Sequence, residues 1–497
     1  MGMKQILGKL AGQTAIYGTS TIVARFLNYM LLPLYTYTLS TADYGVLTEF
    51  MSYIAVLQVL LTMGLETGCF RFANKEGEDP QKVYSTTLVS VGFTSLVFVV
   101  LVFTFISPIS AAMGYADHPS YIWVMAVTVA LDAFQCIPFA YLRYKKRPVK
   151  FAVLKLANII MSIALNLVFF LVLPAWYEST GGEGVVGNIY SPEVGVGYAF
   201  YINLFCSGML MLLLLKELTG FRYVFDRALL RRMLGYSWPI LVLGIAGILN
   251  QTADKILFPY IYKGADAHAQ LGIYGAASKI AMIMAMITQA FRYAYEPFVF
   301  GKSKDKDNRD TYAKAMKYFV IFTLLAFLAV VGYMDILKHL IGRDYWEGLD
   351  VVPIVMAAEI MMGVYFNLSF WYKLIDKTIW GAWFSGAGCL VLIAVNVIFV
   401  PRYGYMACAW AGFAGYATSM LLSYFVGQRH YKINYPLFAI ARYVVVAAVL
   451  CVLMRWANAS MPSWAAIGAN TVLLALFAAM IVKLDFPLGQ IMKRVRK

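Results

Sequence analysis

The chain has 497 residues, of which 61% are hydrophobic and only 13% are charged, and its mean hydropathy is +0.69. This composition excludes an ordinary soluble globular protein. The net charge of +15 does not indicate a nucleic-acid surface either, because the basic residues are spread among the gaps between apolar segments. The six cysteines lie in apolar segments without pairing or metal-type spacing, so they predict neither disulfides nor a metal site.

The apolar segments have the length of membrane-spanning helices. A hydrocarbon core needs about 20 apolar residues per helix, and the sequence predicts about fourteen such helices. In chain order they cover residues 12–39, 43–68, 83–107, 120–142, 149–173, 195–216, 232–262, 270–300, 311–337, 350–372, 378–400, 404–427, 436–456 and 462–484. We therefore predict an all-α integral membrane protein.

The lysines and arginines give the predicted helices an orientation. Most of the 41 basic residues lie at the N-terminus and in every second gap, as in 143–155, 216–232, 302–317 and the basic tail 493–497. Cytoplasmic loops retain positive charge, so both termini are predicted to be inside the cell. The same loops are predicted to contact anionic membrane lipids.

Sequence motifs for catalysis or cofactor binding do not appear. There is no phosphate-binding loop, zinc-protease helix or serine-hydrolase elbow. The most polar external gap, 174–194, is too short for a catalytic domain, and the four histidines have no second ligand at helical spacing. We expect a protein that is not an enzyme and binds no cofactor, with proton or sodium coupling left open. The histidines are His118, His268, His339 and His430.

A weak internal repeat relates the first helices to the seventh and eighth. The sequence DYGVLTEF around Gly45 corresponds to GIYGAASK around Gly275, and in both copies a glutamate follows 21 residues after the glycine, at Glu66 and Glu296. Six helices per copy is an even number, so the copies share an orientation and a pseudo-twofold axis along the membrane normal. The predicted parts are an N-lobe at 1–216 (helices 1–6), a C-lobe at 217–428 (helices 7–12, with a basic linker at 217–231), and helices 13–14 with a cytoplasmic tail at 429–497.

Polar and charged residues inside the predicted helices are the candidate site. Such residues are costly in a bilayer and usually face an interior cavity, although salt bridges and hydrogen bonds that hold the bundle together are the alternative explanation. Cations among the deepest charges favour an anionic substrate, because a guanidinium group can bind two phosphate oxygens. The candidate substrate-binding residues are Arg25, Asn28, Gln251, Lys279 and Arg292. The candidate coupling or gate residues are Glu49, Asp254, Lys255, Glu66 and Glu296.

The opening AGQTAIYGTSTIVARFLNYMLLPLYTYTLSTADYGVLTEF, the helix end GLETGCFRF and the segment LGIYGAASKIAMIMAMITQAFRYAYEPF resemble a known family. They are similar to bacterial polysaccharide repeat-unit flippases of the multidrug/oligosaccharidyl-lipid/polysaccharide (MOP) exporter superfamily. The resemblance implies a two-lobed fold around a central cavity, with alternating access. Arg25 corresponds by helix and depth to a cavity arginine of the related lipid II flippases, and Lys279 and Arg292 lie on the matching eighth helix. The second helix departs from those relatives, because it carries Glu49 and no deep basic residue.

The leading hypothesis is a transporter that flips undecaprenyl-pyrophosphate-linked oligosaccharide repeat units across the bacterial inner membrane, for surface polysaccharides such as O-antigen or capsule. The alternative is a cation-coupled multidrug exporter of the same superfamily, and a membrane glycan polymerase or ligase is a third hypothesis. The expected partners are the lipid-linked oligosaccharide, membrane lipids, and the polysaccharide polymerase and chain-length machinery. The protein is expected to be a monomer.

Overall fold

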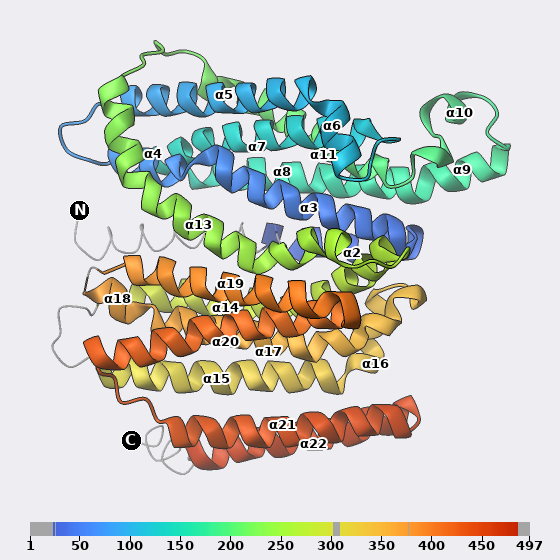
Figure 1. Ribbon diagram of the computed structural model, residues 1–497, viewed down its shortest axis with the longest axis vertical. Coiled ribbons are helices and arrows are strands. Elements are labelled where there is room, and N and C mark those ends of the chain that lie inside the picture. Colours follow the sequence, from blue (N-terminus) through green and yellow to red (C-terminus); the bar gives the residue numbers. More distant parts are fainter. Residues whose placement is uncertain (1–22, 25, 302–308, 376, 486–497) are drawn as a thin grey trace. The chain divides into compact units, whose positions relative to one another are not determined.

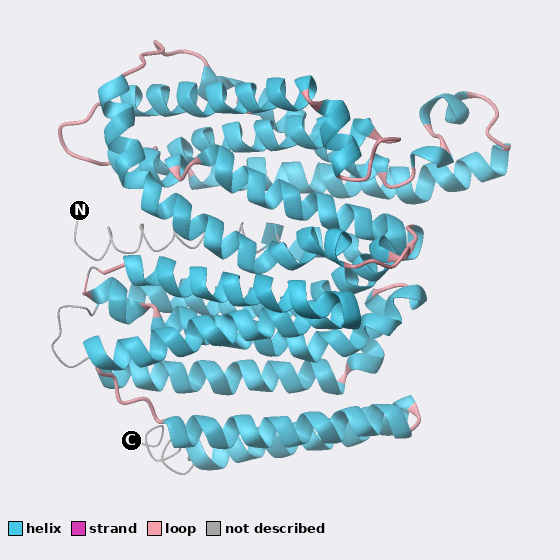
Figure 2. Ribbon diagram, viewed as in Figure 1, coloured by secondary structure: helices cyan, strands magenta, loops and turns pink. Residues whose placement is uncertain are grey.

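The structure is a computed structural model that describes residues 23–24, 26–301, 309–375 and 377–485, without the side chains of 293–294 and 296–301. These residues form helices joined by short loops, and no strand occurs among them (Figure 2). The all-α class predicted from the sequence is therefore confirmed. The chain divides into two compact units, residues 1–275 and 276–497, and the division falls within one helix, α14. The predicted lobe boundaries stay a prediction.

The first unit contains the helices up to the beginning of α14 (Figure 1). They are α2 (Leu31–Thr38), α3 (Thr41–Thr62), α4 (Leu65–Ala73), α5 (Pro80–Thr104), α6 (Ile106–Ala112), α7 (Pro119–Tyr144), α8 (Pro148–Leu167), the π-helix η1 (Val168–Val172), α9 (Leu173–Thr180), α10 (Val185–Ile189), η2 (Pro192–Val194), α11 (Gly197–Leu213), α12 (Leu215–Leu218), α13 (Arg227–Ile261) and α14 (Ala267–Gly301).

The second unit begins inside α14 and continues to the end of the described chain. Its further helices are α15 (Arg309–Gly332), α16 (Met334–Leu337), η3 (Lys338–Leu340), η4 (Arg343–Asp350), α17 (Val351–Leu368), α18 (Phe370–Leu374), α19 (Ile379–Tyr403), α20 (Tyr405–His430), α21 (Leu437–Ser460) and α22 (Ser463–Asp485).

Eleven helices of the described chain are long and apolar enough to cross a membrane, or twelve if the bent pair Val185–Val194 and Gly197–Leu213 forms one span. Residues 12–22 and 25 of the first predicted helix, 12–39, lie outside the described residues. The predicted helix at 404–427 corresponds to α20, which is 26 residues long but is not among the eleven. The predicted total of fourteen and the predicted orientation therefore stay predictions.

Local chemistry explains where several helices begin and break. The Ser40 hydroxyl accepts a hydrogen bond from the Asp43 N–H at the start of α3, which satisfies one unpaired backbone donor. Proline occupies the first position of α5, α7 and α8, where its missing N–H is not needed. Between α3 and α4 the backbone turns left-handed at Met63 and Gly64, with φ values of 49° and 67°. The second predicted helix is therefore a broken one.

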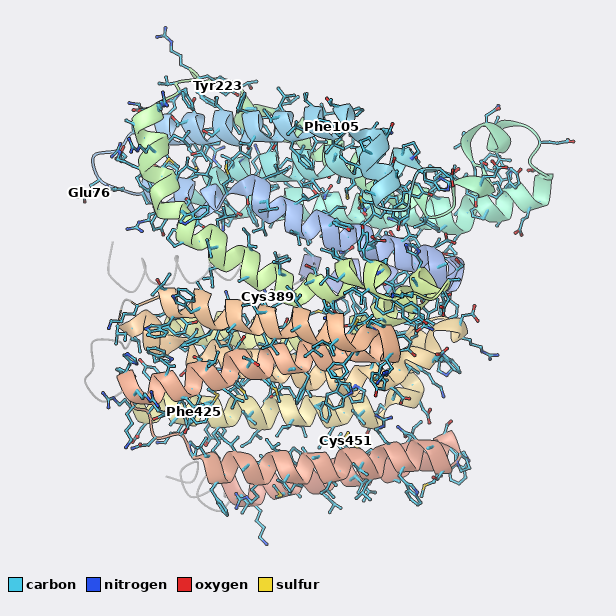
Figure 3. All side chains as sticks on the ribbon, in the orientation of Figure 1. Glu76, Phe105, Tyr223, Cys389, Phe425 and Cys451 are labelled. Carbon is cyan, nitrogen blue, oxygen red and sulfur yellow. The ribbon has the colours of Figure 1, made fainter. Side chains whose placement is uncertain are left out.

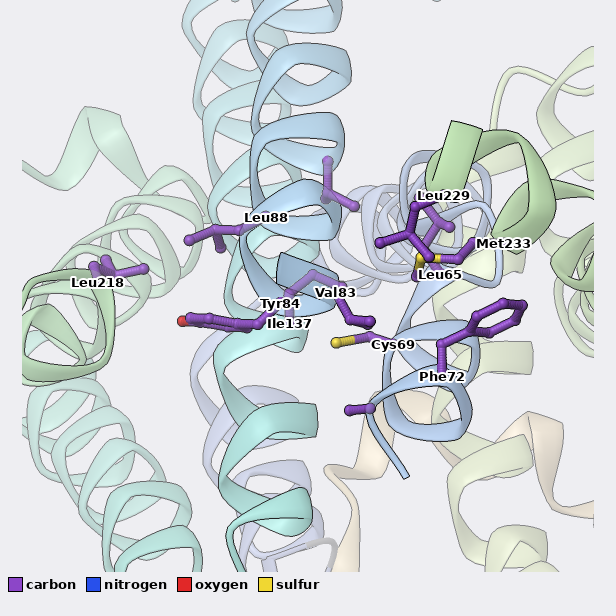
Figure 4. Close-up of a cluster of buried hydrophobic side chains, with 12 residues drawn as sticks. Leu65, Cys69, Phe72, Val83, Tyr84, Leu88, Ile137, Leu218, Leu229 and Met233 are labelled. Atoms are coloured by element: carbon purple, nitrogen blue, oxygen red, sulfur yellow. The ribbon is translucent and has the colours of Figure 1, made fainter. Parts of the chain in front are cut away.

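The core of the first unit lies where α4, α5, α7 and α13 meet (Figure 4). Leu65, Tyr84, Ile137 and Met233 supply one side chain from each of these helices, and each is at most 1% exposed. The Tyr84 hydroxyl also donates to the Glu217 carbonyl, so a buried polar group finds a partner. This cluster packs α4 against α13.

In the second unit, helices pack through small residues and buried amides. A Cβ at Gly388 of α19 would lie 2.6 Å from the Gly415 carbonyl oxygen of α20, so the two helices are in close backbone contact. The pair α21 and α22 packs on α15 (Figure 1). There the buried Asn470 amide donates to the Gly332 carbonyl at 2.8 Å, the kind of interhelical hydrogen bond that holds membrane helices together.

Large apolar side chains also cover the outer surfaces of the helices. Phe105, after α5, and Phe425, on α20, are 53% and 61% exposed (Figure 3). In water such surfaces would be a liability, whereas in hydrocarbon they are the expected surface of a spanning helix. The exposed apolar residues therefore agree with a multi-pass membrane protein.

Candidate functional site

Two glycines bring α3 and the first turns of α14 into direct backbone contact. A Cβ at Gly45 would lie 1.8 Å from the His268 carbonyl oxygen, and one at Gly272 would lie 1.9 Å from the Thr41 carbonyl oxygen. No other residue type fits in so small a space. One turn further along α14, a Cβ at Gly275 would already be 2.5 Å from a side-chain oxygen of α3. The contact fixes which side chains of the two helices can meet.

A buried acidic cluster lies beside this glycine contact. Glu49 follows Gly45 by one turn of α3 and is only 1% exposed. Its Oε2 accepts a hydrogen bond of 2.7 Å from the Tyr115 hydroxyl and lies 3.3 Å from His268 Nε2. Tyr115 and His268 are themselves 2.9 Å apart. The other carboxylate oxygen, Oε1, is buried and has no hydrogen-bond partner among the described residues.

Tyrosines surround this cluster on its other sides. Tyr53 of α3 and Tyr260 of α13 are hydrogen-bonded to each other at 2.8 Å. Tyr115, in the loop before α7, packs edge-on against Phe50. Burial, and next the charge of Glu49, raise the pKa of Tyr115 well above its ordinary value. Its phenol therefore keeps its proton and acts as a hydrogen-bond donor to the carboxylate.

A second buried carboxylate lies on α13. Asp254 is 5% exposed and accepts a hydrogen bond of 2.5 Å from the Tyr274 hydroxyl. The neighbouring Lys255 Nζ lies 3.2 Å from Asp254 and donates to the Gln251 carbonyl at 2.8 Å. The sequence predicted Asp254 and Lys255 as coupling or gate residues and Gln251 as a substrate contact. The structure brings all three together, with the Gln251 side chain exposed.

The second unit contains a small pocket that combines one cation with aromatic rings. Arg292 of α14 lies with its guanidinium 5.0 Å from the ring centre of Phe366. Tyr295, Phe319 and Asn367 line the same pocket, from α14, α15 and α17. A guanidinium group binds phosphate oxygens, and aromatic faces pack against apolar faces of a ligand. The pocket therefore combines a group that can bind an anion with aromatic surfaces.

Glu66, a predicted gate residue, forms an ion pair with Arg143 of α7. The adjacent Arg71 instead lies over the ring of Tyr236, at 4.0 Å from its centre. Both contacts are within the first unit, between α4 and its neighbours α7 and α13. Glu66 is thus part of the helix packing in the state described by the structure.

The structure describes two of the four remaining predicted residues, Asn28 and Lys279, with their side chains. Arg25 lies outside the described residues, as does the side chain of Glu296. Asn28 is exposed, one turn before α2, and Lys279 is partly buried on α14.

The sequence did not single out Tyr115 or His268 as functional residues. Both lie near helix ends, and no local spacing connects them to Glu49. The only available signal was the repeat, which placed glycines at corresponding positions of the two helices that meet. Over the described part of the chain, no group of three or more His, Cys, Asp and Glu residues could hold a metal ion.

These features define a multi-pass α-helical membrane protein with buried charged groups between its helices. Comparison with solved structures shows which known proteins have a similar fold. The chain matches "Lipid II flippase MurJ, inward closed conformation" with a TM-score of 0.71 at 14% identity, covering 94% of this chain and 98% of that one. It also matches an inward-facing multidrug resistance MATE family transporter of the MOP superfamily, with a TM-score of 0.64 at 13% identity, covering 81% and 93% of the two chains.

A third structure, that of the MATE multidrug transporter DinF-BH, matches with a TM-score of 0.60 at 16% identity, covering 87% of this chain and 98% of that one. The chain thus has the fold of these three structures. Residues 10–294, more than half of the chain, match the model of the polysaccharide biosynthesis protein family, and the chain belongs to that family. The resemblance read from the sequence is confirmed. No curated protein matches the chain.

Proposed function

We propose that this protein flips lipid-linked oligosaccharide repeat units across the bacterial inner membrane by alternating access, for surface polysaccharide biosynthesis. The observation that carries the proposal is the combination of two findings. The chain belongs to the polysaccharide biosynthesis protein family, and it shares its fold over 94% of its length with a lipid II flippase. A lipid II flippase moves a sugar attached to a lipid carrier, so the fold suits a cargo with a large polar head and a lipid tail.

The Arg292 pocket supports an anionic, sugar-bearing cargo. A pyrophosphate carries two or more negative charges, which favour a guanidinium group as partner. The partly exposed rings of Phe366 and Tyr295 lie beside Arg292 in this pocket, and aromatic rings of this kind can pack against the apolar face of a sugar. Among the residues predicted from the sequence, Arg292 is therefore the substrate contact that the geometry favours, with Lys279 on the same helix and Arg25 as further candidates.

The experiment uses a deletion strain complemented with variants. Arg292→Ala should abolish surface glycan and cause lipid-linked oligosaccharide to accumulate in the inner leaflet, with the protein level unchanged. Arg309→Ala is the matched control, because Arg309 also lies over an aromatic ring, that of Tyr431, but outside the pocket. Normal glycan in the Arg292→Ala strain removes this pocket from the mechanism. Normal glycan in the deletion strain itself refutes the proposed function.

A multidrug exporter is the second candidate, and the buried carboxylates favour it. Glu49 and Asp254 are acidic groups of the kind that attract cationic drugs, and two of the matching structures are multidrug transporters. Drug sensitivity of the deletion strain with unchanged surface glycan would support this candidate over the flippase. Glycosyl-transfer activity of the purified protein would instead revive the polymerase or ligase hypothesis.

A working flippase of this kind would act beside the enzymes that use its cargo. Polysaccharide polymerase and chain-length proteins are therefore proposed partners, and a monomer is the proposed functional unit. Co-purification after mild cross-linking in cells would test the first, and the mass of the protein in nanodiscs would test the second.

A further inference from the structure

The Glu49 cluster, formed by Glu49, Tyr115 and His268, contains two side chains that can gain or lose a proton near neutral or acidic pH. Its carboxylate is almost completely buried, yet one oxygen has no hydrogen-bond partner among the described residues. Its partners are a tyrosine and a histidine, from the loop before α7 and from the first turn of α14. Histidine is the side chain that changes charge most readily near neutral pH. The cluster therefore pairs a buried acid with a group that can neutralise it.

The groups close to Glu49 include three tyrosines and, further away, two lysines. Tyr53 from its own helix, Tyr260 from α13 and Tyr115 from the α6–α7 loop are neutral phenols. Lys255 of α13 is paired with Asp254, and Lys279 lies eleven residues after His268 on α14. Of the two described side chains that contact Glu49, Tyr115 and His268, the histidine is the one that can carry a positive charge.

Protonation of the pair therefore decides whether a net charge is buried. With one proton added, an imidazolium faces a carboxylate and the pair is neutral. Without it, a carboxylate is buried among neutral partners, which is unfavourable in a low-dielectric environment. The deprotonated pair consequently favours an arrangement in which Glu49 reaches water, and this requires α3 and the start of α14 to separate at the Gly45–Gly272 contact.

We propose that Glu49 and His268 form a proton-binding site, and that the proton bound there decides whether α3 and the start of α14 stay in contact. This inference rests on the proposed transport function. By the predicted orientation, the beginnings of α3 and α14 lie at the external face. A proton from external water forms the Nε2–H bond of His268, directed at Glu49 Oε2, and favours closure of that face.

The test measures closure of the helix contact directly, on the purified full-length protein in nanodiscs. Spin labels are placed at Ala42 and Ala265, which are exposed before Glu49 on α3 and in the α13–α14 loop. Cys136 and Cys451 are first replaced by alanine, because the other four cysteines are buried. Distance distributions are then recorded by pulsed electron paramagnetic resonance from about pH 5 to about pH 8.

We expect the population with the longer label distance, divided by the population with the shorter one, to rise at least about tenfold from the lowest to the highest pH. One linked proton permits a change of this size. Glu49→Gln and His268→Gln should each remove the pH response, and if one of them fails to fold, the other decides. His118→Gln is the matched control, since His118 stacks on Tyr121 without contacting Glu49, and it should respond like the wild type.

Wild-type distances that do not change with pH would overturn the proposal, as would an unaltered response in Glu49→Gln. A response to sodium at constant pH in place of the pH response would also overturn it, as would loss of the response in His118→Gln. The measurement needs no substrate, so it is separate from the glycan assay. A pH-dependent contact in a protein whose deletion leaves surface glycan normal would refute only the transport function.

Discussion

Replacing Gly45 with alanine tests whether the α3–α14 contact controls the conformation of the protein. The added Cβ would lie 1.8 Å from the His268 carbonyl oxygen, whereas a carbon and a carbonyl oxygen normally approach to about 3.3–3.6 Å. The two helices must therefore move apart by about 1.5 Å. The obstacle is backbone, which cannot rotate away as a flexible side chain would.

The magnitude follows from the cost of overpacking, about 1–3 kcal/mol for an inserted methyl group in a well-packed site. Applied to the contacting state alone, this cost raises the population of the separated state by about 5–150-fold. The label pair at Ala42 and Ala265 measures this population. At a pH where the two helices of the wild type are in contact, the fraction of Gly45→Ala molecules with the longer label distance should be larger. Gly208→Ala is the control, because a Cβ there meets nothing within 4 Å. A Gly45→Ala protein with the wild-type distance distribution would refute this reasoning.

Three further predictions concern stability, measured as thermal unfolding of the detergent-solubilised protein. Asp226 forms an ion pair with a lysine and accepts a backbone hydrogen bond, and these two contacts lower its pKa from 3.8 to about 2. The stabilisation that Asp226→Asn removes should therefore be complete above about pH 4 and disappear as the pH falls through about 2; a constant difference contradicts this. Asn470→Leu leaves the Gly332 carbonyl unpaired and should cost about 1–2 kcal/mol, so an unchanged midpoint would show that the bond is dispensable. Ser40→Ala should cost about 1 kcal/mol by removing the cap at Asp43, and Ser40→Thr should largely retain stability. An unfolding midpoint of Ser40→Ala equal to that of the wild type would show that the cap contributes nothing.

Much of the fold was predictable because the bilayer acts on each helix separately. A spanning segment must be apolar over about 20 residues and must satisfy its own backbone hydrogen bonds, and both properties are local. The predicted segments from 43–68 onward accordingly correspond to helices of the structure, including the bounds of α7 within two residues of 120–142. Hydropathy does not reveal where a segment breaks, as at Met63 and Gly64, because such a break comes from backbone conformation.

The candidate site was predictable only as a set of residues. Burial cost alone identifies Glu49, Asp254 and Arg292 as unusual inside apolar helices. It does not reveal their partners, because those come from other helices: Tyr115 and His268 for Glu49, and the ring of Phe366 for Arg292.

The sequence by itself determined the class of the protein, its helices in chain order, and the charged residues that the membrane makes expensive. Tertiary structure alone decided which of those charges meet. Gly45 and Gly272 leave room for two backbones to touch, and that contact sets the register of α3 against α14. Register depends on atoms 200 and more residues apart in the chain, as in the Glu49–His268 pair. Hydropathy and spacing carry no information about such a pairing, because they describe neighbours along one helix.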